Sequence, residues 1–147
     1  MLNEVFDLER IKLNLKSTTR SGVFGELIET IALPHSGFDH EELFEAITLR
    51  ENKMPSIILP GIAIPHGYCT AIHGVIGAIG FSRAGINYDN HNREPVHLFF
   101  LLLMDEASRE RHLRILAQLL ELINSADFAG VREAETSQQV YDLISRY

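Results

Sequence analysis

The stretch VHLFFLLLM, residues 96–104, is apolar at every position except His97 and indicates a strand buried on both of its faces. Residues 75–82 are a second apolar strand candidate, followed by a predicted turn at residues 83–85. After Asp105, apolar residues recur at helical spacing, which predicts an amphipathic helix over residues 108–123. The positions expected to be buried on that helix are Leu113, Leu116, Leu119, Leu120 and Ile123. Two strands beside an amphipathic helix predict an α/β fold.

The N-terminal half adds one strand and two helices to this core. Apolar and polar residues alternate over residues 11–15, which predicts a short half-buried strand. Apolar residues at helical spacing predict a helix over residues 19–33. A connector at residues 34–37 separates it from a second helix, which Asp39 caps and which runs to Glu51.

The middle segment and the C-terminus complete the predicted fold. Prolines and glycines interrupt the apolar residues 54–67, which excludes a helix and predicts two strands, or one strand and a structured loop. We expect a short helix over residues 128–134, and Thr136 with Gln139 predicts a capping box for a last helix. The elements together predict a single compact domain in which a mixed β-sheet is sandwiched between α-helices.

Composition limits the function classes. The chain has 147 residues and a formal net charge of −7, which argues against nonspecific nucleic-acid binding because that requires surplus Lys and Arg. The single cysteine, Cys69, cannot form an intramolecular disulfide and fits a reducing compartment. The N-terminus lacks an apolar signal core, and the longest apolar stretch is far shorter than the ~20 residues that span a bilayer. We therefore expect a cytoplasmic protein without membrane insertion.

His66 has the surroundings best suited to chemistry. It lies between Pro65 and Gly67 at the end of GIAIPHG, residues 61–67, where the chain leaves an apolar segment. The proline restricts the backbone, and the flanking glycines allow another molecule to approach closely. An imidazole that donates one N–H to the backbone presents the other nitrogen as a nucleophile. A turn histidine without function is an equally favoured alternative.

Other sites have weaker support. Cys69 follows His66 by three residues, but no Asn or Asp is evidently placed to orient a thiol dyad, so a buried small side chain is the favoured interpretation. His97 is expected to be structural. The histidines do not show the helical spacing of a zinc hydrolase, although a metal site built from distant histidines stays open. The sequence contains neither a G-x-S-x-G elbow nor a P-loop.

At GIAIPHG the sequence resembles the enzyme IIA domains of the fructose/mannitol class of the bacterial phosphoenolpyruvate:sugar phosphotransferase system, including the nitrogen-regulatory IIA proteins. Three further segments are similar to this family in the same order: LREN at residues 49–52, REPVHLFFLLL at 93–103 and RHLRILAQLLELI at 111–123. The resemblance extends over nearly the whole chain. It identifies residues 1–147 as an enzyme IIA type-2-like phosphocarrier domain.

The resemblance implies a function and a site. His66 would be the phosphorylated nucleophile, which accepts a phosphoryl group from phospho-HPr and passes it to a IIB component or sugar permease. Arg50 and His112 would line the site and stabilise the negative charge of the phosphoryl group in transit. Histidine-to-histidine exchange requires no cofactor and no metal. The alternative is a regulatory protein, similar to the nitrogen-regulatory members, whose binding to a target protein is switched by phosphorylation of His66.

One loop departs from the family pattern. Residues 54–61 read MPSIILPG where the family usually has a Gly-Ser-Thr-Gly-x-Gly-like loop. Ser56 and Gly61 keep the hydroxylated or small character, and we expect them, with Gly67, to support the phosphate. The side chains expected to contact the phosphoryl donor are Ile58, Leu59, Ile62 and Tyr68.

Overall fold

Strand β6 (Val96–Met104) lies at the centre of the fold in the computed structural model of the chain, which describes residues 1–33, 36–89 and 94–147. It pairs antiparallel with β5 (Val75–Ile86) and parallel with β3 (Ile62–Ala63) and β4 (His66–Tyr68). At the edges of the sheet, β1 (Ile11–Lys12) pairs parallel with β5, and β2 (Ile57–Leu59) pairs antiparallel with β3. The six strands form one mixed sheet.

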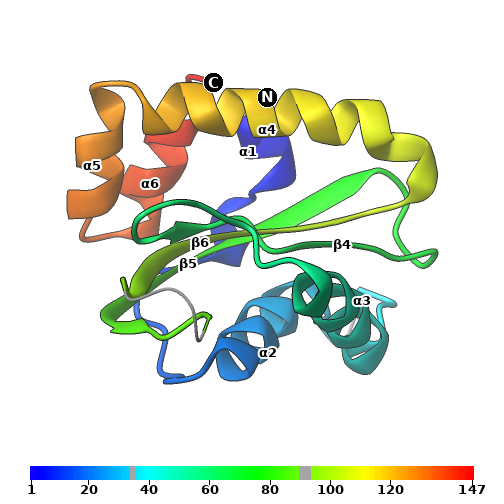
Figure 1. The fold of residues 1–147 in the computed structure, drawn as a ribbon. Helices are drawn as coiled ribbons and strands as arrows, with labels where there is room; N and C mark the ends of the chain where they lie inside the picture. The colour runs from blue at the N-terminus through cyan, green and yellow to red at the C-terminus, as the bar shows by residue number, and fades with distance from the viewer. Residues whose placement is uncertain (34–35, 90–93) are drawn as a thin grey trace.

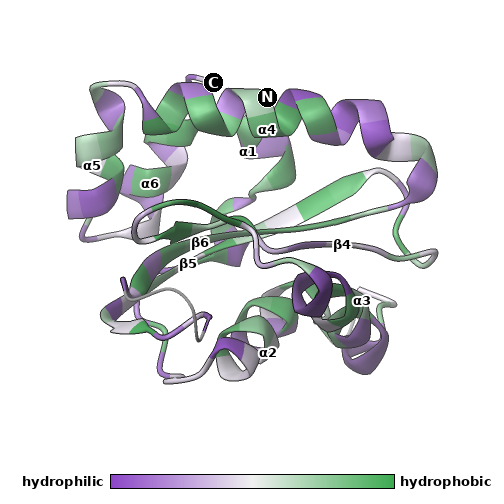
Figure 2. Cartoon of the chain, viewed as in Figure 1, coloured by the Kyte–Doolittle hydropathy of each residue, from purple (hydrophilic) through white to green (hydrophobic). Residues whose placement is uncertain are grey.

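Helices cover both faces of this sheet (Figure 1). One layer contains α1 (Leu2–Val5), α4 (Arg109–Ile123), α5 (Asp127–Glu133) and α6 (Ser137–Ile144). The other contains α2 (Arg20–Ile31) and α3 (His40–Lys53), and the short 3-10 turns η1 (Leu8–Arg10) and η2 (Glu106–Ser108) precede β1 and α4. Figure 2 shows apolar colour along the strands and on the sheet-facing sides of helices. The predicted mixed sheet between helices is confirmed.

β6 is apolar along its length because both of its faces are covered. Leu98, Phe100, Leu102 and Met104 belong to the apolar cluster beneath α4, whereas Phe99, Leu101 and Leu103 belong to the cluster above α2 and α3. Successive side chains of a strand point to opposite faces, so a strand between two helical layers buries every second residue on each side. His97 is its exposed position.

One strand prediction is wrong, and another is confirmed with a shorter strand than expected. The chain does not turn at residues 83–85: β5 continues to Ile86, with a shift in pairing register between Phe81 and Ile86 and a positive φ of 83° at Gly85. Such a bulge takes up extra residues without ending the strand, which a glycine-containing sequence does not distinguish from a turn. The first strand is confined to Ile11–Lys12.

The helices agree with the sequence more closely. Thr19 and Asp39 cap α2 and α3 through their side chains, and Thr136 and Gln139 form the predicted capping box of α6. Helix α1 was not predicted because four residues are too few to show a helical period. Pro34, which belongs to the predicted connector, lies outside the described residues.

The predicted buried stripe of α4 is partly wrong. Leu113 is 61% exposed and Leu120 is 43% exposed. The buried positions on this helix are His112, Ile115, Leu119, Leu122 and Ile123. Leu113 and Leu120 are seven residues apart and therefore share a face, which is turned away from the sheet. Compared with the prediction, α4 is rotated about its axis so that His112 faces the sheet.

Candidate functional site

His66 is the first residue of β4 and is half-buried. Its Nδ1 lies 3.1 Å from the carbonyl oxygen of Ile64 and 3.3 Å from Oγ of Ser56. A backbone carbonyl can only accept a hydrogen bond, so this contact assigns the proton to Nδ1. The lone pair of Nε2 is then available for reaction. This is the tautomer that the sequence analysis expected of a nucleophilic imidazole.

The backbone around His66 is fixed by close packing. His66 pairs with Leu102 of β6, and the amide of Leu102 donates a 2.8 Å hydrogen bond to the carbonyl of Pro65. Gly67 is buried, and a Cβ atom there would lie 2.6 Å from the carbonyl oxygen of Ala46 in α3. Gly67 therefore allows α3 to pack directly on the strand that carries His66.

A fully buried carboxylate lies behind the His66 ring. Glu51, in the last turn of α3, accepts hydrogen bonds from the amide of Ser56 at 2.9 Å and from its hydroxyl at 2.7 Å. It also accepts a 2.6 Å bond from the hydroxyl of Tyr88. Burial and the charge of Glu51 raise the pKa of Tyr88, so the phenol stays a donor. Because Ser56 donates its proton to Glu51, its oxygen is free to accept from Nδ1 of His66.

Glu51 was not recognised from the sequence as part of the site. The available signal is its spacing: Leu43, Ile47 and Glu51 recur every four residues, and all three are buried on α3. A carboxylate at the third position of a buried stripe must have hydrogen-bond donors nearby. The sequence alone does not identify Tyr88 as one of those donors, because it lies 37 residues away along the chain.

Arg50 is placed at the edge of the site by the end of α3. Its Nη1 donates a 2.9 Å hydrogen bond to the carbonyl of Met54 and lies 3.9 Å from Oε2 of Glu51. The side chain retains 30% exposure, so part of the guanidinium faces solvent. Its charge is one of the causes that lower the pKa of His112, so the guanidinium acts electrostatically on that ring.

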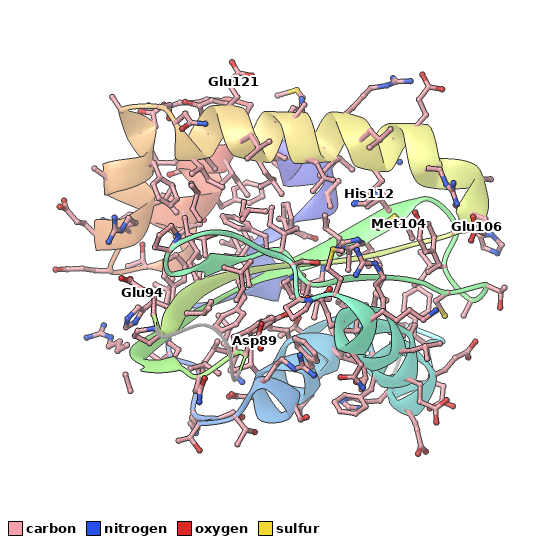
Figure 3. The ribbon with its side chains drawn as sticks, in the orientation of Figure 1. Asp89, Glu94, Met104, Glu106, His112 and Glu121 are labelled. Carbon is pink, nitrogen blue, oxygen red and sulfur yellow. The ribbon has the colours of Figure 1, made fainter. Side chains whose placement is uncertain are left out.

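His112 reaches the site from the opposite face of the sheet. Figure 3 shows it projecting from α4 toward the strands, near Met104. Its ring centroid lies 5.1 Å from that of His66, and its buried Nε2 has no hydrogen-bond partner among the described residues. Burial, followed by the neighbouring His66 and Arg50, lowers the pKa of His112 to about 4. The ring is therefore neutral at pH 7.

The predicted site residues are not all brought together. The rings of His66 and His112 lie 5.1 Å apart, the charge of Arg50 acts on His112, and Ser56 contacts His66, which Gly67 follows on β4. Ser56 was predicted to support the phosphate, but its hydroxyl contacts Nδ1 of His66 and therefore helps to orient the ring.

The structure does not bring Gly61 to this group. Gly61 forms the β2–β3 turn with a φ of 85°, and its carbonyl accepts the amides of His97 and Leu98. On β6, His66 pairs with Leu102, which is four residues beyond Leu98. This spacing corresponds to about 13 Å along the strand, so Gly61 lies far from His66.

The apolar surface around the site also differs from the prediction. Ile62 is buried and cannot contact a donor protein, whereas Ile58 and Leu59 are exposed on the β2 strand and Tyr68 is half-buried. Among the residues near Arg50 and His112 in the sequence, the most exposed apolar side chains are Leu49, Met54 and Leu113.

The alternative chemistries receive little from the geometry. Cys69 is buried, with its thiol 3.7 Å from a carboxylate oxygen of Glu42, and burial raises its pKa. Over residues 1–33, 36–89 and 94–147, no group of three or more His, Cys, Asp or Glu side chains is arranged to hold a metal ion. None of the helices in these same ranges has the length and apolar character needed to cross a bilayer.

Comparison with solved structures supports the fold. The nitrogen regulatory protein IIA-Ntr of Neisseria meningitidis superposes with a TM-score of 0.86 at 24% identity, covering 97% of this chain and 98% of that one. Enzyme IIAMTL of Escherichia coli, solved in complex with phosphorylated enzyme IIBMTL, superposes with a TM-score of 0.79 at 16% identity, covering 97% and 100%. At these identities the likeness concerns the fold.

Sequence comparison identifies the family. A nitrogen regulatory protein of Pseudomonas aeruginosa is 28% identical over 97% of this chain and 94% of its own length. The fructose-specific EIIABC component of Bacillus subtilis is 28% identical over 99% of this chain, which spans 23% of that longer protein. The family model described as "Phosphoenolpyruvate-dependent sugar phosphotransferase system, EIIA 2" matches residues 4–147. The chain belongs to this EIIA family of the phosphotransferase system.

Proposed function

We propose that the protein is a phosphocarrier whose His66 accepts a phosphoryl group from the phosphohistidine of an HPr-like protein and passes it to a IIB component. The observation that carries this proposal is the tautomer of His66: Nδ1–H is bound to the carbonyl of Ile64, which leaves the lone pair of Nε2 available on a ring 5.1 Å from that of His112. The family membership supports phosphoryl transfer as the reaction class. A cytoplasmic location is part of the same proposal.

The proposed step is an in-line exchange between two imidazoles. The lone pair of Nε2 of His66 forms the new N–P bond as the donor's N–P bond breaks, and the donor imidazole keeps the electron pair. The His66 ring becomes positively charged when both of its nitrogens carry a substituent. The hydrogen bonds from Nδ1–H to Ile64 and Ser56, with the Glu51 carboxylate behind Ser56, stabilise that charge.

Arg50 and His112 would bind the oxygens of the phosphoryl group. The guanidinium supplies fixed N–H donors, and the buried Nε2 of His112 gains a partner when an oxygen arrives. A neutral His112 does not repel the positive charge that develops on His66. Phosphorylation should in turn raise the pKa of His112, because a nearby anion favours the imidazolium form.

Two classes of partner follow from the comparisons. Enzyme IIAMTL is solved in complex with phosphorylated enzyme IIBMTL, which supports a IIB component as the acceptor. The relatives named nitrogen regulatory protein support the second candidate, a regulatory protein whose binding to a target depends on the phosphorylation of His66. Leu49, Met54 and Leu113 would form the apolar part of the docking surface in either case.

The test is intact-mass spectrometry after incubation with phosphoenolpyruvate, enzyme I and HPr. We expect an acid-labile gain of one phosphoryl group, which His66→Ala abolishes and His73→Ala, at an exposed histidine, retains. Phosphorus–nitrogen couplings in NMR spectra should place the group on Nε2. A gain that survives in His66→Ala would overturn the proposal. Subsequent loss of the group to a IIB domain would favour transport, and its retention with a change in target binding would favour regulation.

A further inference from the structure

A hollow lies at the end of β6 that is remote from His66. A cavity of about 250 Å³ lies between the start of β6, the end of β5 and helix α5. This volume is a little below the roughly 300–1,000 Å³ of typical ligand pockets and suits a small molecule. Its apolar wall includes Leu98 and Phe128, and its polar groups are Ser82, Arg83, His97 and Arg132. In Figure 1 this is the region where α5 approaches the ends of β5 and β6.

The two arginines of this cavity differ from the other described arginines. Seven arginines make a hydrogen bond or an ion pair: Arg10, Arg20, Arg50, Arg109, Arg111, Arg114 and Arg146. Within residues 1–33, 36–89 and 94–147, neither Arg83 nor Arg132 has such a partner, and both line the same cavity. In a chain with a net charge of −7, two unpaired guanidinium groups at one hollow form a local positive site.

The bulge of β5 shapes the polar side of this cavity. Between Phe81 and Ile86 the strand loses its regular pairing with β6, and Gly85 donates its amide to Oγ of Ser82 at 3.1 Å. Bulges change the direction of side chains, and Arg83 lies within this one. Nδ1 of His97 donates a 2.8 Å hydrogen bond to the carbonyl of Ser82, which leaves Nε2 available as a further polar contact.

We propose that this cavity binds a small organic anion. The oxyanion, a phosphate ester or a carboxylate, would pair with Arg83 and Arg132, and the rest of the molecule would pack on Leu98 and Phe128. Guanidinium groups match both oxyanions with parallel N–H donors, and the apolar wall favours an organic ligand over a free inorganic ion. The site is separate from the phosphoryl site, since Leu98 and Leu102 lie about 13 Å apart along β6.

The test is NMR titration of the isotope-labelled full chain with three probes: glucose 6-phosphate, succinate and inorganic phosphate. We expect shifts of the Ser82–Gly85 and His97 amides with a dissociation constant at or below roughly 1 mM for an organic probe. The preferred probe distinguishes a phosphate ester from a carboxylate. Arg83→Gln and Arg132→Gln should each weaken binding at least roughly tenfold. Arg114→Gln, at an exposed arginine paired with Glu110, is the charge-matched control.

The outcomes separate this proposal from the phosphocarrier proposal. Arg83→Gln and Arg132→Gln should accept a phosphoryl group at the wild-type rate, because both residues lie away from His66. The anion site is overturned if none of the probes binds, if inorganic phosphate binds as tightly as the organic anions, or if Arg114→Gln weakens binding as much as the cavity variants. Failure of phosphorylation at His66 would leave these binding results unaffected.

Discussion

The two helices that reach His66 from opposite faces of the sheet contribute to the site in different ways. On the α3 side, each polar group near the ring has a partner: Glu51 binds Ser56 and Tyr88, and Arg50 binds the main chain. On the α4 side, His112 buries Nε2 without a hydrogen bond. A satisfied buried network adds stability and fixes geometry, whereas an unsatisfied buried nitrogen costs stability. The α3 side thus positions His66, and the α4 side presents an unpartnered nitrogen, which under the proposed function would bind the phosphoryl group.

The largest expected effect comes from removing the carboxylate on the α3 side. Glu51→Ala leaves the amide of Ser56 and the hydroxyl of Tyr88 without their acceptor, so we expect the free energy of unfolding to fall by about 3–5 kcal/mol. Urea denaturation followed by circular dichroism measures this free energy of unfolding. Glu45→Ala, at an exposed position on the same helix, should change stability by less than about 0.5 kcal/mol. Equal effects of the two substitutions would contradict a stabilising network.

The α4 side predicts a pH dependence of stability. The pKa of His112 is about 4 in the folded chain and 6.5 for the ordinary group, so between these values the unfolded chain binds a proton that the folded chain does not. The free energy of unfolding should therefore fall as the pH drops from 6.5 to about 4. At 1.4 kcal/mol per pKa unit the loss is roughly 3 kcal/mol.

Denaturation curves at several pH values check this dependence. His112→Gln should flatten the profile over this range, because glutamine does not titrate. Glu26 titrates further into acid: burial raises its pKa, but hydrogen bonds from the Lys16 and Ser17 amides, with Lys12, lower it overall to about 2. Its contribution to stability is lost below pH 4.5, so both proteins should share that lower part of the curve. A profile unchanged by His112→Gln would show that the buried imidazole is not the cause.

The close contact of α3 with β4 predicts a smaller effect. Gly67→Ala places a Cβ atom 2.6 Å from the carbonyl oxygen of Ala46, and backbone must move to accept it. We expect a loss of about 1–3 kcal/mol in the free energy of unfolding, with slower phosphorylation because His66 is adjacent. Gly25→Ala is the matched control, since its Cβ would meet nothing within 4 Å and alanine favours a helix by about 1 kcal/mol. A tolerated Gly67→Ala would mean that α3 can shift without cost.

The sequence predicted the parts of the molecule that local patterns determine. β6 carries apolar side chains on both of its faces, so its central position in the sheet could be predicted from a single stretch of residues. His66 stood out because Pro65 restricts its local backbone and Gly67 allows another molecule to approach closely. Gly61 belongs to the same motif, yet it lies at the far end of β6 because the motif folds into two separate strands.

Non-local contacts account for what the sequence did not reveal. One of the two hydrogen-bond partners of Glu51 is Tyr88, and no local pattern joins them. On α4, leucines and isoleucines occur on two neighbouring faces, so periodicity alone did not show that Ile115 packs inward and Leu113 outward. Tertiary packing selects between such faces, and the burial of His112 followed from that selection.

The smallest effect on stability is expected at the outer face of α4. Leu113→Ser should change the free energy of unfolding by less than about 0.5 kcal/mol, because the side chain is already exposed. If Leu113 belongs to the docking surface, the same substitution should weaken binding of HPr roughly tenfold or more, measured by titration calorimetry. Leu120→Ser is the control, since Leu120 is exposed on the same face two turns farther from His112. Equal losses of HPr affinity at the two positions would mean that the whole exposed face of α4 contributes to binding. The end of α4 that carries His112 would then not differ from the remainder of the helix.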